Sequence, residues 1–535
     1  MFQFNSNVNI IRINQFHLSL ILLILIAVVI VTFIKYTTIY GTEESNPSLT
    51  VTEGLASGDV TNDSAIIWSR VNKPSIMHVE FANNTSFINS KSETKFVDQN
   101  TDFTGNIKLN NLTAATKYFY RVYFSTLDNN ITSSSIVGTF KTAPNLVKSS
   151  DSISFIVGAD IGGQTYCRER NTGYSIFEEM TKLKPDFYIQ NGDMIYADND
   201  CPKQRLDGHQ NIAGNFFGIS DPKVNWNNKT QVHDIYLKHW LYNRADPHLQ
   251  NFLKNTSMYS QWDDHEVLDD FGADWSYWNS ENQNRTGYQN LVHEGRNTFF
   301  NFSPIAQNII DPNQIYRSFH WGNDLDLLIL DARSDRSRND VTDTIDNNKT
   351  MLGAEQLTWL KDNLLHSNAT WKVVSSDVPI SIPTGVNSSK FGRDGWANGI
   401  SLDFSSKTGF EGELKKIMKF IDDNNIINVI FVTTDVHFPI ILKYNADMNG
   451  DGDSSNVYEI ISGPLSAFTL GIPSAPLLML DPTFQPTIFY VEGGIFNFAY
   501  IQIIEGTDGK SHMIVDIIGA DGIARPNSHL DLIAQ

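Results

Sequence analysis

The sequence predicts an α/β protein in which a small all-β domain precedes a layered α/β domain. Residues 48–145 contain short runs of alternating apolar and polar residues, such as 64–71 and 117–123, separated by clusters of Asn, Thr, Gly and Asp. This spacing is typical of an immunoglobulin- or fibronectin-like β-sandwich of about a hundred residues. From residue 151 onward apolar strands alternate with amphipathic helices, which is the pattern of a layered α/β domain extending over 151–535.

The composition indicates a globular chain with a large buried core. Of the 535 residues, 41% are hydrophobic and only 19% are charged, which excludes a disordered acidic polymer. The chain has 40 basic and 60 acidic residues and a net charge of −20. A field of this sign repels nucleic acid, so a nucleic-acid coat protein is excluded. An anionic substrate therefore requires a local reversal of the charge.

An apolar run near the amino terminus predicts a membrane anchor. Residues 18–34 contain no charge and no proline, and as a helix they would span about 25 Å, near the lower limit for crossing a bilayer. A cleaved signal segment is the alternative, although no A-x-A pattern follows the run. Twelve N-x-[S/T] sequons follow in the chain, and such sites are glycosylated only outside the cytoplasm. We therefore expect a single-pass membrane glycoprotein with a cytoplasmic tail within residues 1–47 and an extracellular or lumenal remainder, or else a secreted protein.

Six strands and three helices are predicted in the first part of the α/β domain. The strands are 152–158, 186–190, 258–262, 325–330, 372–376 and 428–432, and the helices are 174–183, 354–365 and 411–423. Residues 200–229 predict a long polar loop, and beyond residue 458 the chain returns to short strands and turns.

Each of the six strands runs into polar side chains, and each of these groups includes a carboxylate that can bind a metal ion. In chain order these are Asp160, then Asp193 with Tyr196, Asp264 with His265, Asp331 with Arg333, Asp377, and finally Asp435 with His437. Because the carboxyl ends of strands in open α/β sheets form the ligand crevice, we expect these side chains to converge. A single Asp after a strand is more often the N-cap of a helix. Six such endings would bring like charges together, and cations between them would relieve the repulsion. The pattern predicts a multinuclear metal site.

The order of these motifs resembles that of the calcineurin-like metallophosphoesterase superfamily. An Asp after the first strand is followed by Gly-Asp-x-x-Tyr at 192–196, Asp-Asp-His-Glu at 263–266 and Asp-x-His at 435–437. Within the superfamily the chain is most similar to the PhoD-like alkaline phosphatase/phosphodiesterase family, over about residues 50 to 520. Further agreement lies at 54–60, 67–70, 259–267, 330–333 and 353–360. The resemblance implies a metallophosphoesterase-like β-sandwich core with flanking helices.

The resemblance also implies the metal ligands. An iron ion would be held by Asp160, Cys167, Asp193, Tyr196 and His437. Asp193 would bridge to a second metal, calcium in this family, which Asp264 and Asp435 would also hold. Thiolate and phenolate donors suit Fe(III) and oxygen ligands suit Ca²⁺, while other divalent metals stay open.

Two features of the sequence leave alternatives to these assignments. Cys167 and Cys201 are the only cysteines, and in an oxidising compartment they would pair with each other. Asp269 and Asp270 stand where the family often has paired asparagines, and their carboxylates can alter which metal binds.

The function implied is the hydrolysis of phosphoric monoesters or diesters by a metal-bound hydroxide, with His265 as general acid. Arg333 is a candidate contact for the substrate phosphate, and a buried ion pair with Asp331 is the alternative. A second hypothesis is a catalytically inactive cell-surface adhesion or binding protein on the same scaffold, but all the implied ligands are chemically competent. The predicted partners are a phosphate ester and, through the anchor, a membrane. The oligomeric state and the physiological substrate stay open.

Overall fold

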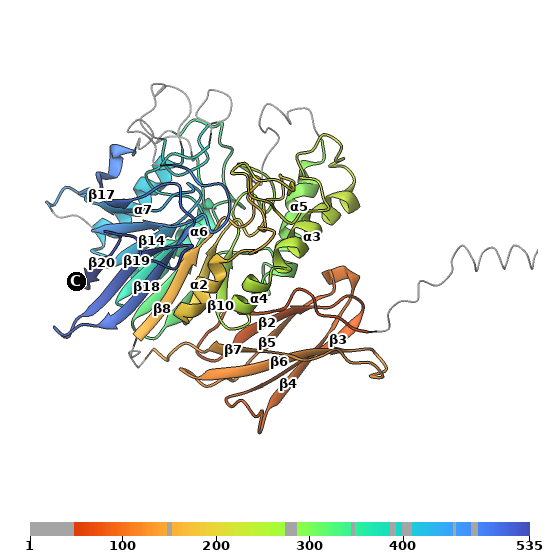
Figure 1. The fold of residues 1–535 in the computed structure, drawn as a ribbon. Helices are drawn as coiled ribbons and strands as arrows, with labels where there is room; N and C mark the ends of the chain where they lie inside the picture. Colours follow the sequence, from red (N-terminus) through yellow and green to blue (C-terminus); the bar gives the residue numbers. More distant parts are fainter. Residues whose placement is uncertain are drawn as a thin grey trace, which may run out of the picture. The chain divides into compact units, whose positions relative to one another are not determined.

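The computed structural model describes residues 48–146, 152–272, 286–343, 348–385, 392–398, 409–452, 456–471 and 480–535. These residues form three β-sheets with helices on the outside (Figure 1). A four-stranded antiparallel sheet belongs to the amino-terminal part, in the order β4 (Lys91–Val97), β3 (Ser75–Ala82), β6 (Lys117–Ser125) and β7 (Ile136–Lys141). It packs against the three other amino-terminal strands, β1 (Leu55–Gly58), β2 (Ala65–Arg70) and β5 (Thr104–Leu109).

These three strands are part of a larger sheet that continues into the rest of the chain. Its order is β20-β19-β18-β8-β9-β10-β1-β2-β5. The strands not yet given are β8 (Ser152–Gly158), β9 (Phe187–Asn191), β10 (Ser257–Gln261), β18 (Asn497–Glu505), β19 (Ser511–Gly519) and β20 (Leu530–Ile533). The junction is a parallel pairing of β1 with β10 at Gly58 and Met258. The amino-terminal sandwich is thus joined to the larger body through backbone hydrogen bonds.

A seven-stranded mixed sheet forms the second layer. Its order is β11 (Arg317–Trp321), β12 (Leu325–Ile329), β13 (Trp371–Ser375), β14 (Val429–Thr433), β16 (Val457–Ile461), β15 (Ile440–Tyr444) and β17 (Pro486–Val491). Apolar residues of β8 and β9 face those of β12, β13 and β14 in one buried cluster between the two large sheets. Strands buried on both faces read as continuous apolar runs, which explains why they stand out in the sequence.

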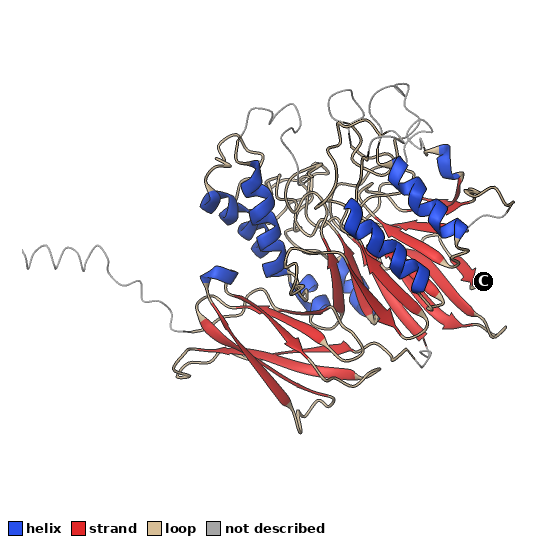
Figure 2. Cartoon of the chain, turned by 180° about the vertical axis from the view of Figure 1, so that it is seen from behind, coloured by secondary structure: helices blue, strands red, loops and turns tan. Residues whose placement is uncertain are grey.

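The helices cover the outer faces of this sandwich (Figure 2). The helices that share a core with the nine-stranded sheet are α2 (Ile176–Leu183), α3 (Lys229–Arg244), α4 (Pro247–Leu253) and α5 (Tyr288–Phe302). The helices α6 (Gly353–His366) and α7 (Glu411–Asp423) share a core with the seven-stranded sheet. Two 3₁₀ turns, η1 (Gln99–Thr101) and η2 (Pro482–Phe484), complete the regular structure of the described residues.

The predicted fold class is confirmed, and the element bounds agree closely. β8 and α7 have the predicted bounds, and the other predicted strands lie within one residue of theirs. The helices α3, α4 and α5 were not predicted. The division of the chain into domains at residues 145–151 stays a prediction.

The predicted membrane localisation is contradicted. Among the described residues no helix is long and apolar enough to cross a bilayer. The run 18–34, on which the anchor and the signal-segment alternative both depended, lies outside the described residues.

A histidine forms ion pairs that link the amino-terminal sandwich to the helices of the larger body. His233 on α3 contacts Asp102, which follows η1, with 2.7 Å between Nε2 and the carboxylate. Its Nδ1 lies 2.8 Å from a carboxylate oxygen of Glu294 on α5. Asn301 donates a further hydrogen bond to Asp102. Hydrogen bonds to the two carboxylates raise the pKa of His233 to about 10, so the imidazolium bridges the two anions at neutral pH.

We expect His233→Ala to lower the free energy of unfolding by about 2 kcal/mol at pH 7, because it leaves the buried Asp102 without its cation. Glu294 loses one partner but keeps Lys229 at 3.2 Å. The pKa of His233 is higher in the folded state than in the unfolded state. Its contribution is therefore complete below about pH 6.5 and is lost as the pH rises through 10. Urea denaturation at pH 6, 8 and 10 measures this difference. The exposed His529→Ala is the control and should change stability little at any of these pH values. A constant effect of His233→Ala from pH 6 to 10 would contradict the charged bridge.

Candidate metal centre

The loops that follow β8, β9 and β14 bring three of the predicted ligands into direct contact. The hydroxyl of Tyr196 lies 3.0 Å from Nε2 of His437 and 3.4 Å from Oδ1 of Asp160. His437 Nε2 is itself 3.7 Å from the same carboxylate oxygen. All three side chains are buried. A carboxylate, a phenol and an imidazole thus point at one small volume.

A second group of ligands adjoins the first. Ligand atoms of Asp193, Asp264 and His265 all lie within 4.8 Å of one another. The backbone of Ile161, next to Asp160, donates a 2.8 Å hydrogen bond to the carbonyl of Asp193, which ties the two groups together. Asp435 belongs to the same neighbourhood, because Asp264 and Asp160 are among the groups that act electrostatically on it.

Four of the predicted ligands have a left-handed backbone conformation. The φ angles are 63° at Asp160, 53° at Asp193, 76° at Asp435 and 58° at His437. Such angles are uncommon outside glycine and cost free energy, and they concentrate at functional sites where the surrounding structure enforces them. The backbone of Gly463 also passes so close to Asp160 that a Cβ there would lie 2.4 Å from its carboxylate. The loops are thus held in strained conformations around these side chains.

The carboxylates of this cluster fit bound cations. Among the described residues Asp193 Oδ2, Asp264 Oδ1 and Asp435 Oδ2 are buried without a hydrogen-bond partner. Burial, together with neighbouring carboxylates, raises the pKa of Asp193 and Asp435 well above the usual range. Burial likewise raises the pKa of Asp160. Buried carboxylate oxygens of this kind are ordinarily paired or bound to metal, so the donor set suits multivalent cations.

Asp264 also belongs to a second acidic group. Ligand atoms of Asp264, Asp269 and Asp270 lie within 4.8 Å of one another, and the backbone of Asp270 donates a 2.6 Å hydrogen bond to Asp264 Oδ2. The two residues that replace the family's paired asparagines therefore adjoin a predicted metal ligand.

His265 is held by a carboxylate that the sequence analysis did not single out. Its Nδ1 lies 2.5 Å from Asp198 Oδ1, and its ring stacks on Tyr196 with 4.1 Å between centroids. Burial lowers the pKa of His265, but Asp198, Asp264 and Asp193 outweigh it and the pKa is raised well above the usual value. Its Nε2 lies 3.8 Å from Asp269 Oδ1.

Glu266 is a second residue that sequence reasoning missed. Its carboxylate accepts hydrogen bonds from the backbone of Asp193, Met194 and Asp263 at 3.1, 2.6 and 2.9 Å. It is fully buried. Glu266 therefore joins the loops after β9 and β10 and fixes Asp193 relative to Asp264.

The structure shows Arg333 in contact with carboxylates rather than with open space, and its predicted substrate contact stays a prediction. The side chain has no exposed surface, and its guanidinium lies 2.6 Å from Asp263 and 2.8 Å from Asp394. Asp377 and Asp264 follow at 3.5 and 3.9 Å. The predicted alternative pairing with Asp331 is not the one observed, because Asp331 accepts from the backbone of Arg333. Arg333 offsets part of the negative charge behind the candidate metal centre.

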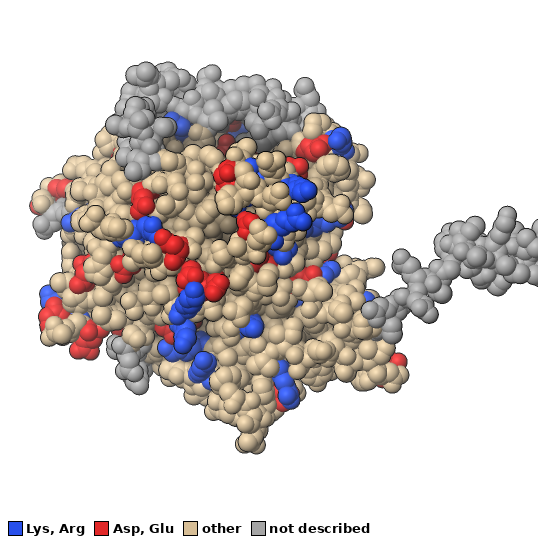
Figure 3. All heavy atoms as spheres, viewed as in Figure 1, with Lys and Arg blue, Asp and Glu red and all other residues tan. Residues whose placement is uncertain are grey.

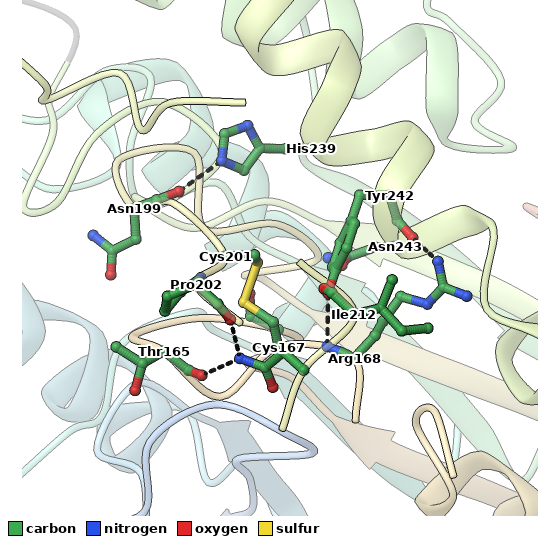
Figure 4. The surroundings of a disulfide bond; sticks show 12 residues. Thr165, Cys167, Arg168, Asn199, Cys201, Pro202, Ile212, His239, Tyr242 and Asn243 are labelled. Atoms are coloured by element: carbon green, nitrogen blue, oxygen red, sulfur yellow. Dashed lines mark hydrogen bonds between the residues drawn. A yellow bond between two sulfur atoms is a disulfide. The ribbon is translucent and has the colours of Figure 1, made fainter. Parts of the chain in front are cut away.

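The structure contradicts the predicted ligand role of Cys167. Cys167 forms a disulfide with Cys201, which links the segment after β8 to the segment after β9 (Figure 4). A disulfide sulfur has no thiolate charge and cannot serve as the anionic donor that the resemblance implies. Asn211 donates to the carbonyls of Thr165 and Pro202 beside the bridge. The disulfide therefore stabilises the loop that carries Asp160.

We expect Cys167→Ala and Cys201→Ala to lower the free energy of unfolding equally, by about 3.5 kcal/mol each for a bridge between residues 34 positions apart. Urea denaturation under non-reducing conditions measures the loss. Both variants should also retain the same metal content, measured by elemental analysis. Metal loss in Cys167→Ala alone would instead identify Cys167 as a ligand.

The paired sheets and the cluster of carboxylates and histidines at their strand ends define a protein with a metallophosphoesterase-like fold and a candidate metal centre. The family of PhoD-like phosphatases matches residues 155–485, and the N-terminal domain of that family matches residues 38–144. The chain therefore belongs to the PhoD-like phosphatase family.

Individual relatives agree with this assignment. Alkaline phosphatase D of Bacillus subtilis (strain 168) is 24% identical over 420 residues, which are 72% of this chain and 64% of that protein. The chain thus matches less than two thirds of this relative's length. The structure of PhoD superposes with a TM-score of 0.70 at 18% identity, covering 91% of this chain and 93% of the other. A purple acid phosphatase from yellow lupin (Lupinus luteus) seeds gives a TM-score of 0.57 at 14% identity, covering 91% and 74%. At these identities the structural likeness establishes the fold.

Proposed function

We propose that this chain hydrolyses phosphoric esters, monoesters or diesters, in a reaction that depends on bound metal ions. The observation that carries the proposal is the cluster of Asp160, Asp193, Asp264, Tyr196 and His437, in which buried carboxylate oxygens lack hydrogen-bond partners. Membership of the PhoD-like phosphatase family and the likeness to alkaline phosphatase D support the same reaction.

We infer two kinds of metal from the chemistry of the donors. Asp160, Tyr196 and His437, with Asp193, would hold an iron ion, because phenolate and carboxylate oxygens suit Fe(III). Asp193, Asp264 and Asp435 would hold calcium, which prefers oxygen ligands. Asp193 is the carboxylate common to both sets. When bound, the ions supply the positive charge that attracts the phosphoryl oxygens and activates water for attack.

The side chains of the chain itself then divide the remaining tasks. Asp193 holds the two sites together, and its own backbone is fixed by Glu266. His265 would donate the proton that the leaving oxygen needs, from Nε2, while Asp198 holds Nδ1. We expect no phosphorylated side chain as an intermediate, because no Ser, Thr or His nucleophile stands out in the sequence.

Metal analysis of the purified full chain, combined with assays on a monoester and a diester, tests the proposal. We expect iron and calcium in the folded protein and turnover of at least one ester class. Removal of the metals by a chelator should reduce turnover by at least roughly 10³-fold, because the phosphoryl charge is then left uncompensated, and adding the metals back should restore it. Far-UV circular dichroism before and after chelation controls for unfolding. Folded, metal-free protein with full turnover would overturn the proposal, and so would metal-loaded protein inactive on both ester classes.

A further inference from the structure

Three lysines line a cavity of about 400 Å³ that lies away from the candidate metal centre. We call this cavity the lysine pocket. It is defined by Lys117 on β6, Lys141 and Thr139 on β7, Lys184 after α2, and Asp186 with Thr256 on the connections that lead into β9 and β10. It opens where the amino-terminal sandwich meets the larger body. Figure 3 shows basic side chains gathered below α2, over the seam with β6 and β7.

The two strand lysines of the pocket face each other. Lys117 and Lys141 are directly opposite in the antiparallel pairing of β6 with β7. Like charges at such a position destabilise a sheet, because the side chains leave adjacent strands side by side. The face of Phe119 lies 5.6 Å from the Lys117 ammonium, but a ring does not neutralise the charge. The arrangement therefore favours anions beside these lysines, and Asp186 supplies one of them to Lys141.

Among the described residues that line the pocket, one carboxylate faces three lysines. Lys141 Nζ lies 2.7 Å from Asp186 Oδ1, and the backbone of Ser154 donates to Asp186 Oδ2. Within the part of the chain that the structure describes, Lys117 and Lys184 have no carboxylate partner. Three ammonium groups and one carboxylate leave a net charge of +2 in a chain whose net charge is −20.

A lysine next to the pocket, in contrast, is paired with acidic side chains. Lys182, two residues before Lys184, lies 2.7 Å from Glu179 and 3.6 Å from Glu178. A positive side chain after α2 is also favoured by the helix dipole, which accounts in part for Lys184. That effect does not reach Lys117 and Lys141, which lie on strands. The excess charge of the pocket is thus not explained by the fold.

We propose that the lysine pocket binds a phosphate group, either inorganic phosphate or the phosphate of an ester. Two excess positive charges match a phosphate dianion, lysine is a common phosphate ligand, and the hydroxyls of Thr139 and Thr256 are additional donors on the wall. The pocket lies at the start of β8 and the metal centre follows its end, so β8 separates the two sites by about 20 Å. Binding in the lysine pocket does not depend on the hydrolytic reaction.

Equilibrium dialysis of the full chain with labelled inorganic phosphate at low ionic strength tests the proposal. Wild type should bind one phosphate that the double variant Lys117→Gln/Lys184→Gln does not bind, or binds at least tenfold more weakly. Both variant side chains are exposed, and the double variant should keep its unfolding midpoint and its turnover of esters. Lys182→Gln is the matched control, because it removes a lysine of the same surface that two glutamates already neutralise, and it should bind as wild type does.

Competition by methylphosphonate, which resists hydrolysis, separates the two sources of the phosphate group. Displacement of labelled phosphate by methylphosphonate supports a pocket that accepts a substituted phosphate. Displacement by inorganic phosphate alone supports a pocket for the free ion. Equal phosphate binding by wild type and the folded double variant would overturn the proposal, whatever the activity of the metal centre.

Discussion

Asp193→Asn should lower kcat for phosphoric esters by at least roughly 10³-fold while leaving the fold intact. Asp193 is the carboxylate shared by the two proposed metal sites, and one of its oxygens is buried without a hydrogen-bond partner. Asparagine has nearly the same shape, and it tolerates the left-handed backbone at this position, where φ is 53°. It can also keep the 3.3 Å hydrogen bond from the backbone of His265. The substitution therefore removes the negative charge and little else.

The control for this variant is Asp234→Asn, which removes an exposed carboxylate that pairs with Lys238 on α3. It should leave kcat unchanged. Elemental analysis of both variants should show metal loss in Asp193→Asn alone, and circular dichroism should show both folded. Near-normal turnover by metal-loaded Asp193→Asn would contradict the assigned role of Asp193.

The strands that carry the site could be predicted because they are buried on both faces. β8, β9, β12, β13 and β14 lie between the sheets or under helices, so each is rich in apolar residues and is followed by polar ones. In several cases the polar residue after the strand is a proposed ligand, so the ends of the strands indicate the candidate site.

The helices α3 and α5 could not be predicted in the same way. The buried residues of α3 have regular helical spacing, namely Val232, Ile235, Tyr236, His239, Trp240, Asn243 and Arg244. Three of the seven are polar, so the apolar stripe that identifies an amphipathic helix is broken. Asn243 is buried because its amide donates to the carbonyls of Ile161 and Met194. Tertiary hydrogen bonds of this kind leave no local pattern in the sequence.

The continuation of the nine-stranded sheet into the amino-terminal sandwich was equally hidden. β1 pairs with β10 across two hundred residues of chain, and nothing in the alternation of β1 distinguishes a strand that closes a sandwich from one that joins another sheet. Asp59 reinforces this junction, because it receives hydrogen bonds from the guanidinium of Arg317 and from the backbone of Ala306. Only the three-dimensional pairing reveals this role.

Site residues were predictable where a motif ended a strand, and less so where they act through another residue. Asp198 lies two positions after Tyr196, in the same loop, but only the 2.5 Å contact with His265 shows its role. The family resemblance implied a ligand role for Cys167, with pairing to Cys201 as the alternative, and the structure has the disulfide.

The net charge of −20 conceals local differences in charge. The acidic residues at the centre are a local excess that bound cations would reverse, and the lysine pocket is a positive surface that the total conceals. The charge of the whole chain therefore does not exclude an anionic ligand at either place.

His265→Gln should lower kcat by roughly 10²- to 10⁴-fold for esters with an alkyl alcohol as leaving group, and by much less for esters of an acidic phenol. An alkoxide needs a proton as its bond to phosphorus breaks, whereas a phenolate leaves without one. His265 is suited to supply that proton because its Nδ1 is held by Asp198 and its pKa is raised by the surrounding carboxylates. The ratio of kcat for a phenyl ester to kcat for an alkyl ester measures the effect within one variant, so a loss of active protein cancels.

Asp198→Asn should also raise the ratio of kcat for a phenyl ester to kcat for an alkyl ester, but only by roughly tenfold. The substitution weakens the positioning of the His265 ring and lowers the pKa of His265, but the imidazole remains. A purely structural role for Asp198 would lower both rates alike and leave the ratio unchanged. His239→Gln is the matched control, since His239 is also buried but both of its ring nitrogens contact backbone carbonyls, of Ile235 and Asn199. This variant should lower stability and leave the ratio at the wild-type value. An unchanged ratio in His265→Gln would mean that the leaving oxygen takes its proton from another donor. That result would contradict the roles proposed for both His265 and Asp198.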